Sequence, residues 1–140
     1  MSDATILVVD DEDLIRFTLR QRLEAAGHTV LEAGTGGEDQ AHLDGDVDLV
    51  LLDYKLPDTD GVSLLQRIKQ AGPDRVVTLM SAFPTIETAV QAMKLGAFHY
   101  AVKPFDLDEF MLQVDKALET ARLKREVRAL RASVSEPFAF

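Results

Sequence analysis

The amino-acid sequence predicts an α/β domain in which a parallel sheet carries helices on both faces. Two observations lead to this prediction. Short apolar runs alternate with segments of helical periodicity along residues 5–120, and strands that alternate with helices form parallel sheets with right-handed crossovers. The apolar runs are also nearly uninterrupted, as is typical of strands buried on both faces. The order of elements along the chain leaves the order of strands in the sheet open.

The individual elements follow from apolar runs, caps and glycine stops. Strands are expected at residues 5–9, 28–33, 49–53, 76–80 and 98–102. The first helix ends at Gly27, and a weaker helix is expected at 35–43. Asp60 and Thr85 are predicted to cap the next two helices, and a long helix begins near Asp106. The inner faces of the first four helices are predicted to carry Ile15, Leu19, Leu23, Ala41, Leu43, Val62, Leu65, Ile68, Ile86, Ala89, Val90 and Met93.

Composition excludes several classes of protein. The chain has no cysteine, so a disulfide framework, a thiolate zinc site and a cysteine nucleophile are all ruled out. The first residues lack the basic region of a signal peptide, and no apolar stretch approaches the ~20 residues that a membrane helix needs. We therefore expect a soluble, cytoplasmic protein that makes no contact with a membrane.

The charge is unevenly distributed along the chain. Residues 1–119 hold 10 Lys or Arg against 22 Asp or Glu, a balance of -12, whereas residues 120–140 hold 5 against 2, a balance of +3. Nucleic-acid affinity rests largely on Lys and Arg that neutralise phosphates. The body of the protein is therefore not expected to bind nucleic acid directly.

Polar side chains stand at the ends of four predicted strands: Asp10 and Asp11, then Asp53, Ser81 and Lys103. Because the carboxyl ends of parallel strands share one edge, these groups are expected to converge on one pocket. Taken alone, an aspartate at a strand end such as Asp53 is more often a turn former or a helix cap than a reactive group. The other strand ends favour a functional role.

This set of groups suits phosphoryl transfer. Crowded carboxylates repel one another unless a cation neutralises them, and ligands that are all oxygen atoms favour Mg²⁺. An ionised aspartate can attack phosphorus to give an aspartyl-phosphate, and we assign that role to Asp53. Lys103 and Mg²⁺ would neutralise the phosphoryl oxygens, and Ser81 would donate a hydrogen bond to one of them.

Four segments resemble the receiver domain of bacterial two-component response regulators. They are VVDDE at 8–12, LLDYKLPDTDG at 51–61, LMSA at 79–82 and AVKPF at 101–105. The resemblance implies a receiver domain over residues 1–120 with a flavodoxin-like (βα)5 fold and strand order 2-1-3-4-5. It also implies that Asp53 accepts a phosphoryl group from the phosphohistidine of a sensor histidine kinase.

The same resemblance assigns roles around Mg²⁺. It implies that Asp11 and Asp53 bind the ion, that Asp10 acts through water and that the Lys55 carbonyl is a further ligand. It also implies a cis bond between Lys103 and Pro104. Chemistry of this kind is limited to the protein's own phosphorylation and dephosphorylation, so we do not expect an enzyme. A magnesium-dependent phosphatase is disfavoured because Lys55 stands where such an enzyme carries its second aspartate.

The resemblance further couples Ser81 to Tyr100. When phosphate draws Ser81 inward, the tyrosine ring can follow, which reshapes the face made by the fourth helix, the fifth strand and the fifth helix. Without the family context, Tyr100 reads as a half-buried aromatic residue of a strand.

Residues 121–140 are predicted to form a helical extension or linker beyond the domain. Its apolar residues are Leu123, Val127, Leu130 and Val134, and their spacing is that of a short coiled coil. The seam could bury itself against a second copy in a parallel dimer, although flanking basic residues would repel. The alternative is a solvated, fraying basic tail.

The segment AVQAMKLGAFHYAVKPFD, at 89–106, and the long helix after it look most like receivers of the nitrogen-regulation class of transcriptional activators. In that class the helix leads to an ATPase domain and a DNA-binding domain, neither of which lies in these 140 residues. We therefore expect a receiver that controls a covalently linked output domain. The alternative is a stand-alone receiver that docks on a partner protein.

Overall fold

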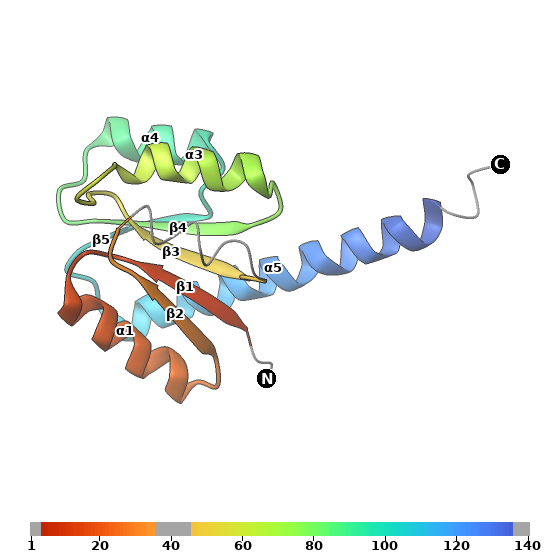
Figure 1. The fold of residues 1–140 in the computed structure, drawn as a ribbon, viewed down its shortest axis with the longest axis horizontal. Coiled ribbons are helices and arrows are strands. Elements are labelled where there is room, and N and C mark those ends of the chain that lie inside the picture. The colour runs from red at the N-terminus through yellow and green to blue at the C-terminus, as the bar shows by residue number, and fades with distance from the viewer. Residues whose placement is uncertain (1–3, 36–45, 136–140) are drawn as a thin grey trace.

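The computed structural model describes residues 4–35 and 46–135, which form five strands and four helices (Figure 1). The elements are β1 (Thr5–Val9), α1 (Asp13–Ala25), β2 (Thr29–Ala33), β3 (Leu49–Asp53), α3 (Gly61–Ala71), β4 (Val76–Ser81), α4 (Ile86–Lys94), β5 (His99–Val102) and α5 (Leu107–Ser135). The weak helix predicted at 35–43 lies, apart from Thr35, outside the described residues. No helix in the described part of the chain is long and apolar enough to cross a membrane.

The strands form one parallel sheet in the order β2-β1-β3-β4-β5. This order confirms the doubly wound, flavodoxin-like fold that the resemblance implied. Helices α1 and α5 cover one face of the sheet, and α3 and α4 cover the other (Figure 1). Because the chain leaves β1 and β3 toward opposite faces, a crevice opens between the ends of these adjacent strands, which is where such sheets bind ligands.

Alternate residues of each central strand point into two separate apolar cores. In β3, Leu49 and Leu51 pack with α1 and α5, whereas Val50 and Leu52 pack with α3. All five residues of β3 are buried, which explains why this segment is an unbroken apolar run rather than an alternating one. Its final residue, Asp53, is therefore the one charged group in an otherwise apolar strand.

The predicted inner faces of α1 and α3 are confirmed. Leu19 and Leu23 of α1 are buried and Ile15 packs against the same core, and α3 buries the apolar residues Val62, Leu64, Leu65 and Ile68. The predicted caps are also present: the Asp60 side chain accepts a hydrogen bond from the backbone N–H of Ser63 at 2.8 Å, and Thr85 forms a capping box with Thr88.

The predicted inner face of α4 is wrong for its three large apolar residues. Ile86, Val90 and Met93 are 84%, 46% and 50% exposed, whereas Ala92 is fully buried and Ala89 is partly buried. The helix lies on its small residues, which bring its backbone close to the sheet, and its large apolar residues face outward. Apolar periodicity gives the position of a stripe on a helix but not the side on which the sheet lies.

Helix α5 packs on the sheet with its first half and continues beyond it (Figure 1). Phe110, Val114, Ala117 and Ala121 are buried against the sheet. Farther along, Leu123, Val127 and Leu130 are 47%, 46% and 63% exposed. The side chain of Val134, the fourth residue of the predicted seam, lies outside the described residues.

Ion pairs tie the start of the α5 extension to the N-terminal edge of the sheet. Arg125 lies 2.5 Å from Asp48 and 3.1 Å from Asp46, and Arg128 lies 3.8 Å from Asp74. Asp48 also accepts a hydrogen bond from the backbone N–H of Thr5 at 2.7 Å. These arginines therefore face carboxylates of the body, which reduces the repulsion expected along the seam.

Candidate functional site at the carboxyl edge of the sheet

The strand register brings the predicted site residues to one edge. Asp53 pairs with Met80 across β3 and β4, so it stands one residue short of the level of Ser81. The backbone N–H of Lys103 donates to the Ser81 carbonyl at 2.7 Å, which sets the end of β5 beside the end of β4. On the other side, the N–H of Asp10 donates to the Ala33 carbonyl at 3.0 Å. Residues from four strand ends therefore meet as predicted.

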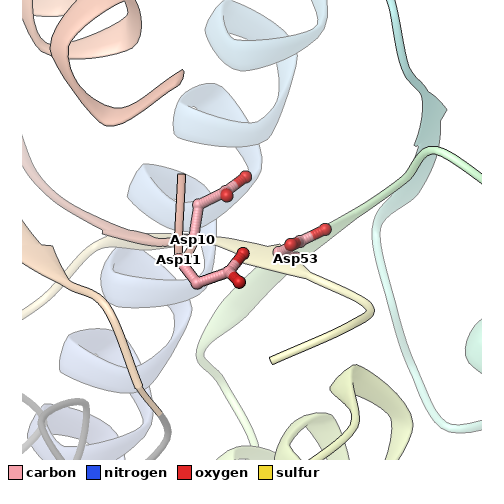
Figure 2. A group of neighbouring side chains, drawn as sticks. All are labelled: Asp10, Asp11 and Asp53. Atoms are coloured by element: carbon pink, nitrogen blue, oxygen red, sulfur yellow. The ribbon is translucent and has the colours of Figure 1, made fainter. Parts of the chain in front are cut away.

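Three carboxylates cluster at this edge (Figure 2). Oxygen atoms of Asp10, Asp11 and Asp53 all lie within 4.8 Å of one another. Asp10 is fully buried and Asp53 is 6% exposed, whereas Asp11 is open to solvent. Asp11 and Asp53 line a cavity together with Lys55, Ser81 and Lys103. The cluster thus has a buried side toward the sheet and an open side toward solvent.

Lys103 supplies a buried positive charge to the cluster. Its Nζ donates to Asp10 Oδ2 at 2.7 Å and lies 3.2 Å from Asp53 Oδ1, and the side chain is only 8% exposed. Burial by itself lowers the pKa of Lys103, but the hydrogen bond and charge of Asp10, together with the charge of Asp53, raise it above the ordinary lysine value. Lys103 therefore stays protonated at neutral pH.

The pKa of Asp53 is raised to about 6. The largest cause is burial, which disfavours the charged form, and the negative charge of Asp10 adds to it. Lys103 acts in the opposite direction but does not offset these effects. One ammonium group is thus too little positive charge for the carboxylates that surround it, and a bound cation would stabilise the ionised form.

The donor set fits a hard divalent cation. The clustered groups are carboxylate oxygens, and the open side at Asp11 leaves room for water, as Mg²⁺ prefers. Asp10, Asp11 and Asp53 are the residues that would hold the ion. Lys55 lines the same cavity, and the role of its carbonyl as a further ligand stays a prediction.

A close approach of two backbone segments holds the loop between β3 and α3 against the site. The Gly61 N–H donates to the Tyr54 carbonyl at 2.5 Å. A Cβ atom added at Gly61 would lie 2.6 Å from the Tyr54 Cα and 2.8 Å from the Asp53 carbonyl oxygen. Only glycine fits there. The sequence showed Gly61 as a helix start but did not reveal this requirement.

Ser81 lies in the pocket with the acidic cluster, whereas Tyr100 contacts helix α4. Ser81 is buried, lines the cavity, and its Oγ accepts a hydrogen bond from the Phe83 N–H at 3.1 Å. The Tyr100 hydroxyl lies 3.0 Å from Thr88 Oγ1, in the first turn of α4. The contact with Thr88 was not predicted, because a hydrogen bond between a strand and a helix leaves no local mark in the sequence.

Two further residues of the site were also missed. The Glu12 carboxylate lies 3.4 Å from the Lys103 ammonium, and Arg16 donates to the Asp10 carbonyl at 2.5 Å. Glu12 is part of the VVDDE segment and could have been considered with its neighbours. Arg16 is not among the inner-face residues predicted for its helix, and a charged residue at such a position carries no local signal of a role in the site. The Lys103-Pro104 peptide bond is cis, as the resemblance implied.

The fold and this site together define a flavodoxin-like signalling domain with an acidic pocket at the carboxyl edge of its sheet. The chain belongs to the response regulator receiver domain family, whose model matches residues 6–115. This match confirms the family that the sequence segments indicated.

Relatives place the chain near the nitrogen-regulation group. It is 39% identical over 132 residues to the regulatory protein AtoC of Escherichia coli strain K12 and 44% identical over 121 residues to the DNA-binding transcriptional regulator NtrC of Azospirillum brasilense. These matches cover 93% and 86% of this chain but only 28% and 25% of the relatives. The chain therefore spans about a quarter of their length.

A solved structure of the same group is also similar. The beryllofluoride-activated NtrC4 receiver domain dimer, solved in solution, is 35% identical, with a TM-score of 0.79, over 84% of this chain and 98% of that one. The chain is thus a receiver domain related to NtrC-type regulators.

Proposed function

We propose that this receiver takes a phosphoryl group from the phosphohistidine of a sensor histidine kinase onto Asp53. An Asp53 carboxylate oxygen attacks the phosphorus in line, the bond between phosphorus and the imidazole nitrogen breaks, and its electron pair returns to the imidazole. The product is an aspartyl-phosphate. Mg²⁺, when bound, would neutralise charge on the phosphoryl oxygens.

The observation that carries this proposal is the insufficient positive charge around Asp53. Lys103 pairs with Asp10 and Asp53, and Asp11 adds a third carboxylate beside them. The nucleophile is buried at the end of an apolar strand beside an open cavity. Lys103 holds a proton and a positive charge where phosphoryl oxygens would lie. Ser81, at the end of β4, could exchange its hydrogen bond with the Phe83 N–H for a hydrogen bond with the phosphoryl group.

The signal would be read on the face made by α4, β5 and α5. Tyr100 on β5 is bonded through its hydroxyl to Thr88 of α4, and α4 presents Ile86, Val90 and Met93 to solvent. When Ser81 moves toward the phosphoryl group, Tyr100 can turn inward and release Thr88. The first turn of α4 would then shift, which changes the shape of its apolar surface.

The output is a covalently linked domain that activates transcription. The named relatives are regulatory proteins, and this chain corresponds to about a quarter of each of them. In this proposal the receiver acts on no separate substrate and does not itself bind nucleic acid. Its own chemistry is phosphorylation and dephosphorylation of Asp53.

A second copy of the chain would cover the exposed seam of α5. Leu123, Val127 and Leu130 are spaced as core residues of a coiled coil and are about half exposed. In a parallel pair, Glu119 would face Lys124 of the partner subunit and Glu126 would face Arg131 of the partner subunit, so both flanking pairs are opposite in charge. An antiparallel pair would set basic residues against basic residues. The relative NtrC4 receiver is described as a dimer.

Incubation with acetyl phosphate and Mg²⁺, followed by intact-mass measurement, tests the phosphoryl acceptor. The wild type should gain one phosphoryl group, and Asp53→Asn should gain none. Asp58→Asn, in the same loop, is the matched control and should behave like the wild type. Uptake that is undiminished in Asp53→Asn would refute the assignment.

The dimer is tested by sedimentation of a Leu123→Glu, Leu130→Glu double variant. We expect the wild-type dimer to become a monomer because charged residues enter the seam. Leu112→Glu is the control, since Leu112 is 61% exposed on the same helix but lies outside the seam. A mass that is the same in the wild type and the double variant would favour the stand-alone receiver that docks on another protein.

A further inference from the structure

One arginine holds the backbone that carries the acidic cluster. Arg16 lies in α1, and its side chain is only 18% exposed. Its Nη1 donates to the Asp10 carbonyl at 2.5 Å, its Nε donates to Glu32 Oε1 at 3.1 Å, and its Nη2 donates to Asp13. The planar guanidinium thus connects the loop after β1, strand β2 and the start of α1 at once.

The bond to the Asp10 carbonyl fixes the peptide that joins Asp10 to Asp11. The other groups of Asp10 are already held: its N–H by Ala33 and its carboxylate by Lys103 and the Glu12 N–H. Asp11 differs, because no hydrogen bond or ion pair among the described residues holds its exposed carboxylate. The direction of the Asp11 side chain therefore depends on the orientation of this peptide plane. Arg16 fixes that orientation through its hydrogen bond to the Asp10 carbonyl.

Glu32 orients Arg16 and balances its charge. The second carboxylate oxygen of Glu32 accepts a hydrogen bond from Arg20 Nη1 at 2.5 Å, so Glu32 is held between two arginines of α1. With Glu32 and Asp13 beside it, the Arg16 guanidinium adds little net positive charge behind the cluster. It can therefore position the carboxylates without repelling a cation.

We propose that Arg16, oriented by Glu32, is a positioning residue for a divalent cation held by Asp10, Asp11 and Asp53. Groups that hold metal ligands in place commonly change metal affinity by about 10- to 100-fold when they are removed. Arg16 acts through the backbone rather than through a ligand side chain. The identity of the site rests on the proposed function, but cation binding can be measured without phosphorylation.

The test is a titration with Mn²⁺, a paramagnetic probe for the site, in which electron paramagnetic resonance reports the free ion. Arg16→Gln should bind Mn²⁺ about tenfold more weakly than the wild type. Arg20→Gln is the matched control, because Arg20 also bonds to Glu32 but does not reach Asp10, and it should bind within twofold of the wild type, a margin of about 0.4 kcal/mol. Arg16→Lys keeps the positive charge and changes the packing less than Arg16→Gln does. It should still bind Mn²⁺ about fivefold more weakly than the wild type, because an ammonium group lacks the planar fork of a guanidinium.

A second measurement separates positioning from general loss of structure. In the acetyl phosphate reaction, Arg16→Gln should raise the half-saturating Mg²⁺ concentration about tenfold while the rate at saturating Mg²⁺ stays within about twofold. Affinity that is unchanged in both Arg16 variants, or an equal loss in Arg20→Gln, would overturn the proposal. If the wild type binds Mn²⁺ but takes up no phosphoryl group, the proposed function fails while the role of Arg16 stands or falls on the titration alone.

Discussion

The carboxylates at the two edges of the sheet differ in burial and in the positive charge that lies beside them. At the N-terminal edge, Asp46, Asp48 and Asp74 face the guanidinium groups of Arg125 and Arg128. At the carboxyl edge, the ammonium group of Lys103 pairs with two buried carboxylates, Asp10 and Asp53, and Asp11 adds a third carboxylate that has no ion pair among the described residues. Acidic residues alone therefore do not mark the site.

The difference lies in desolvation and counter-charge. A buried carboxylate that is not fully compensated costs stability, and such a cost persists where a function requires it. The N-terminal edge is structural, since its charges are compensated by α5. The carboxyl edge lacks such compensation, and changing one counter-charge at a time should affect the stability of the protein differently at the two edges.

The largest effect on stability is expected from Lys103→Met. The change leaves Asp10, which is fully buried, without the cation that pairs with it. Loss of one partner of a buried ion pair costs about 3 kcal/mol or more, so the free energy of unfolding measured in urea should fall by about that amount. The double variant Lys103→Met, Asp10→Asn should recover part of the loss, since it also removes the buried charge. A Lys103→Met protein as stable as the wild type would show that Asp10 is compensated in another way.

Asp53→Asn is expected to raise the free energy of unfolding in the absence of metal, by less than Lys103→Met lowers it. The folded-state pKa of Asp53 is about 6, above its ordinary value of 3.8, so the folded protein binds this proton more tightly than the unfolded chain does. Ionisation therefore costs stability as pH rises from about 4 to about 6. With about 1.4 kcal/mol for each pKa unit, reduced because the pocket is open to water, Asp53→Asn should stabilise the protein by about 1 to 2 kcal/mol at pH 7.

This gain should disappear below pH 4, where the wild-type carboxyl group is protonated in both states. Urea unfolding at several pH values measures it, and Mg²⁺ should narrow the difference at pH 7 by stabilising the ionised wild type. A gain that is the same at every pH would mean that packing, rather than charge, is responsible.

The smallest effect is expected at the other edge, from Arg125→Gln. Arg125 is 43% exposed and its partner Asp48 keeps the hydrogen bond from Thr5. Partly exposed pairs contribute about 1 kcal/mol or less, and salt screens them. The loss in unfolding free energy should therefore be below about 1 kcal/mol and should shrink further at high salt. Lys116→Gln, at an exposed position of the same helix, serves as the reference. A loss in Arg125→Gln as large as that of Lys103→Met would abolish the distinction between the edges.

Most of the fold could be predicted because its signals are local. The apolar runs at Leu49–Asp53 and Val76–Ser81 identify strands buried on both faces, and the caps at Asp60 and Thr85 mark where helices begin. The convergence of Asp10, Asp53 and Lys103 also follows from the parallel direction of the strands. The strand order itself came from the resemblance rather than from the pattern.

What could not be predicted depends on contacts between distant segments. The alanine face of α4 is in contact with the sheet because Ala92 allows a closer approach than Ile86 or Met93 would, which no count of apolar residues reveals. The bond from Arg16 to the Asp10 carbonyl and the approach of Gly61 to Tyr54 depend on how the chain folds back. The extension of α5 was predicted, but the ion pairs that fix its direction were not.

The direction of α5 gives it the properties of a lever arm. Among the residues of α5 whose side chains the structure describes, Ala121 is the last buried one, and the helix continues to Ser135, so roughly 20 Å of helix extends past Ala121 at 1.5 Å per residue. The ion pairs of Arg125 and Arg128 join the first part of this segment to the body. A rotation of only about 5° at the sheet would displace the far end by about 2 Å over such a length. A small rotation at the sheet would therefore reach the far end of α5 as a movement about the size of an atom.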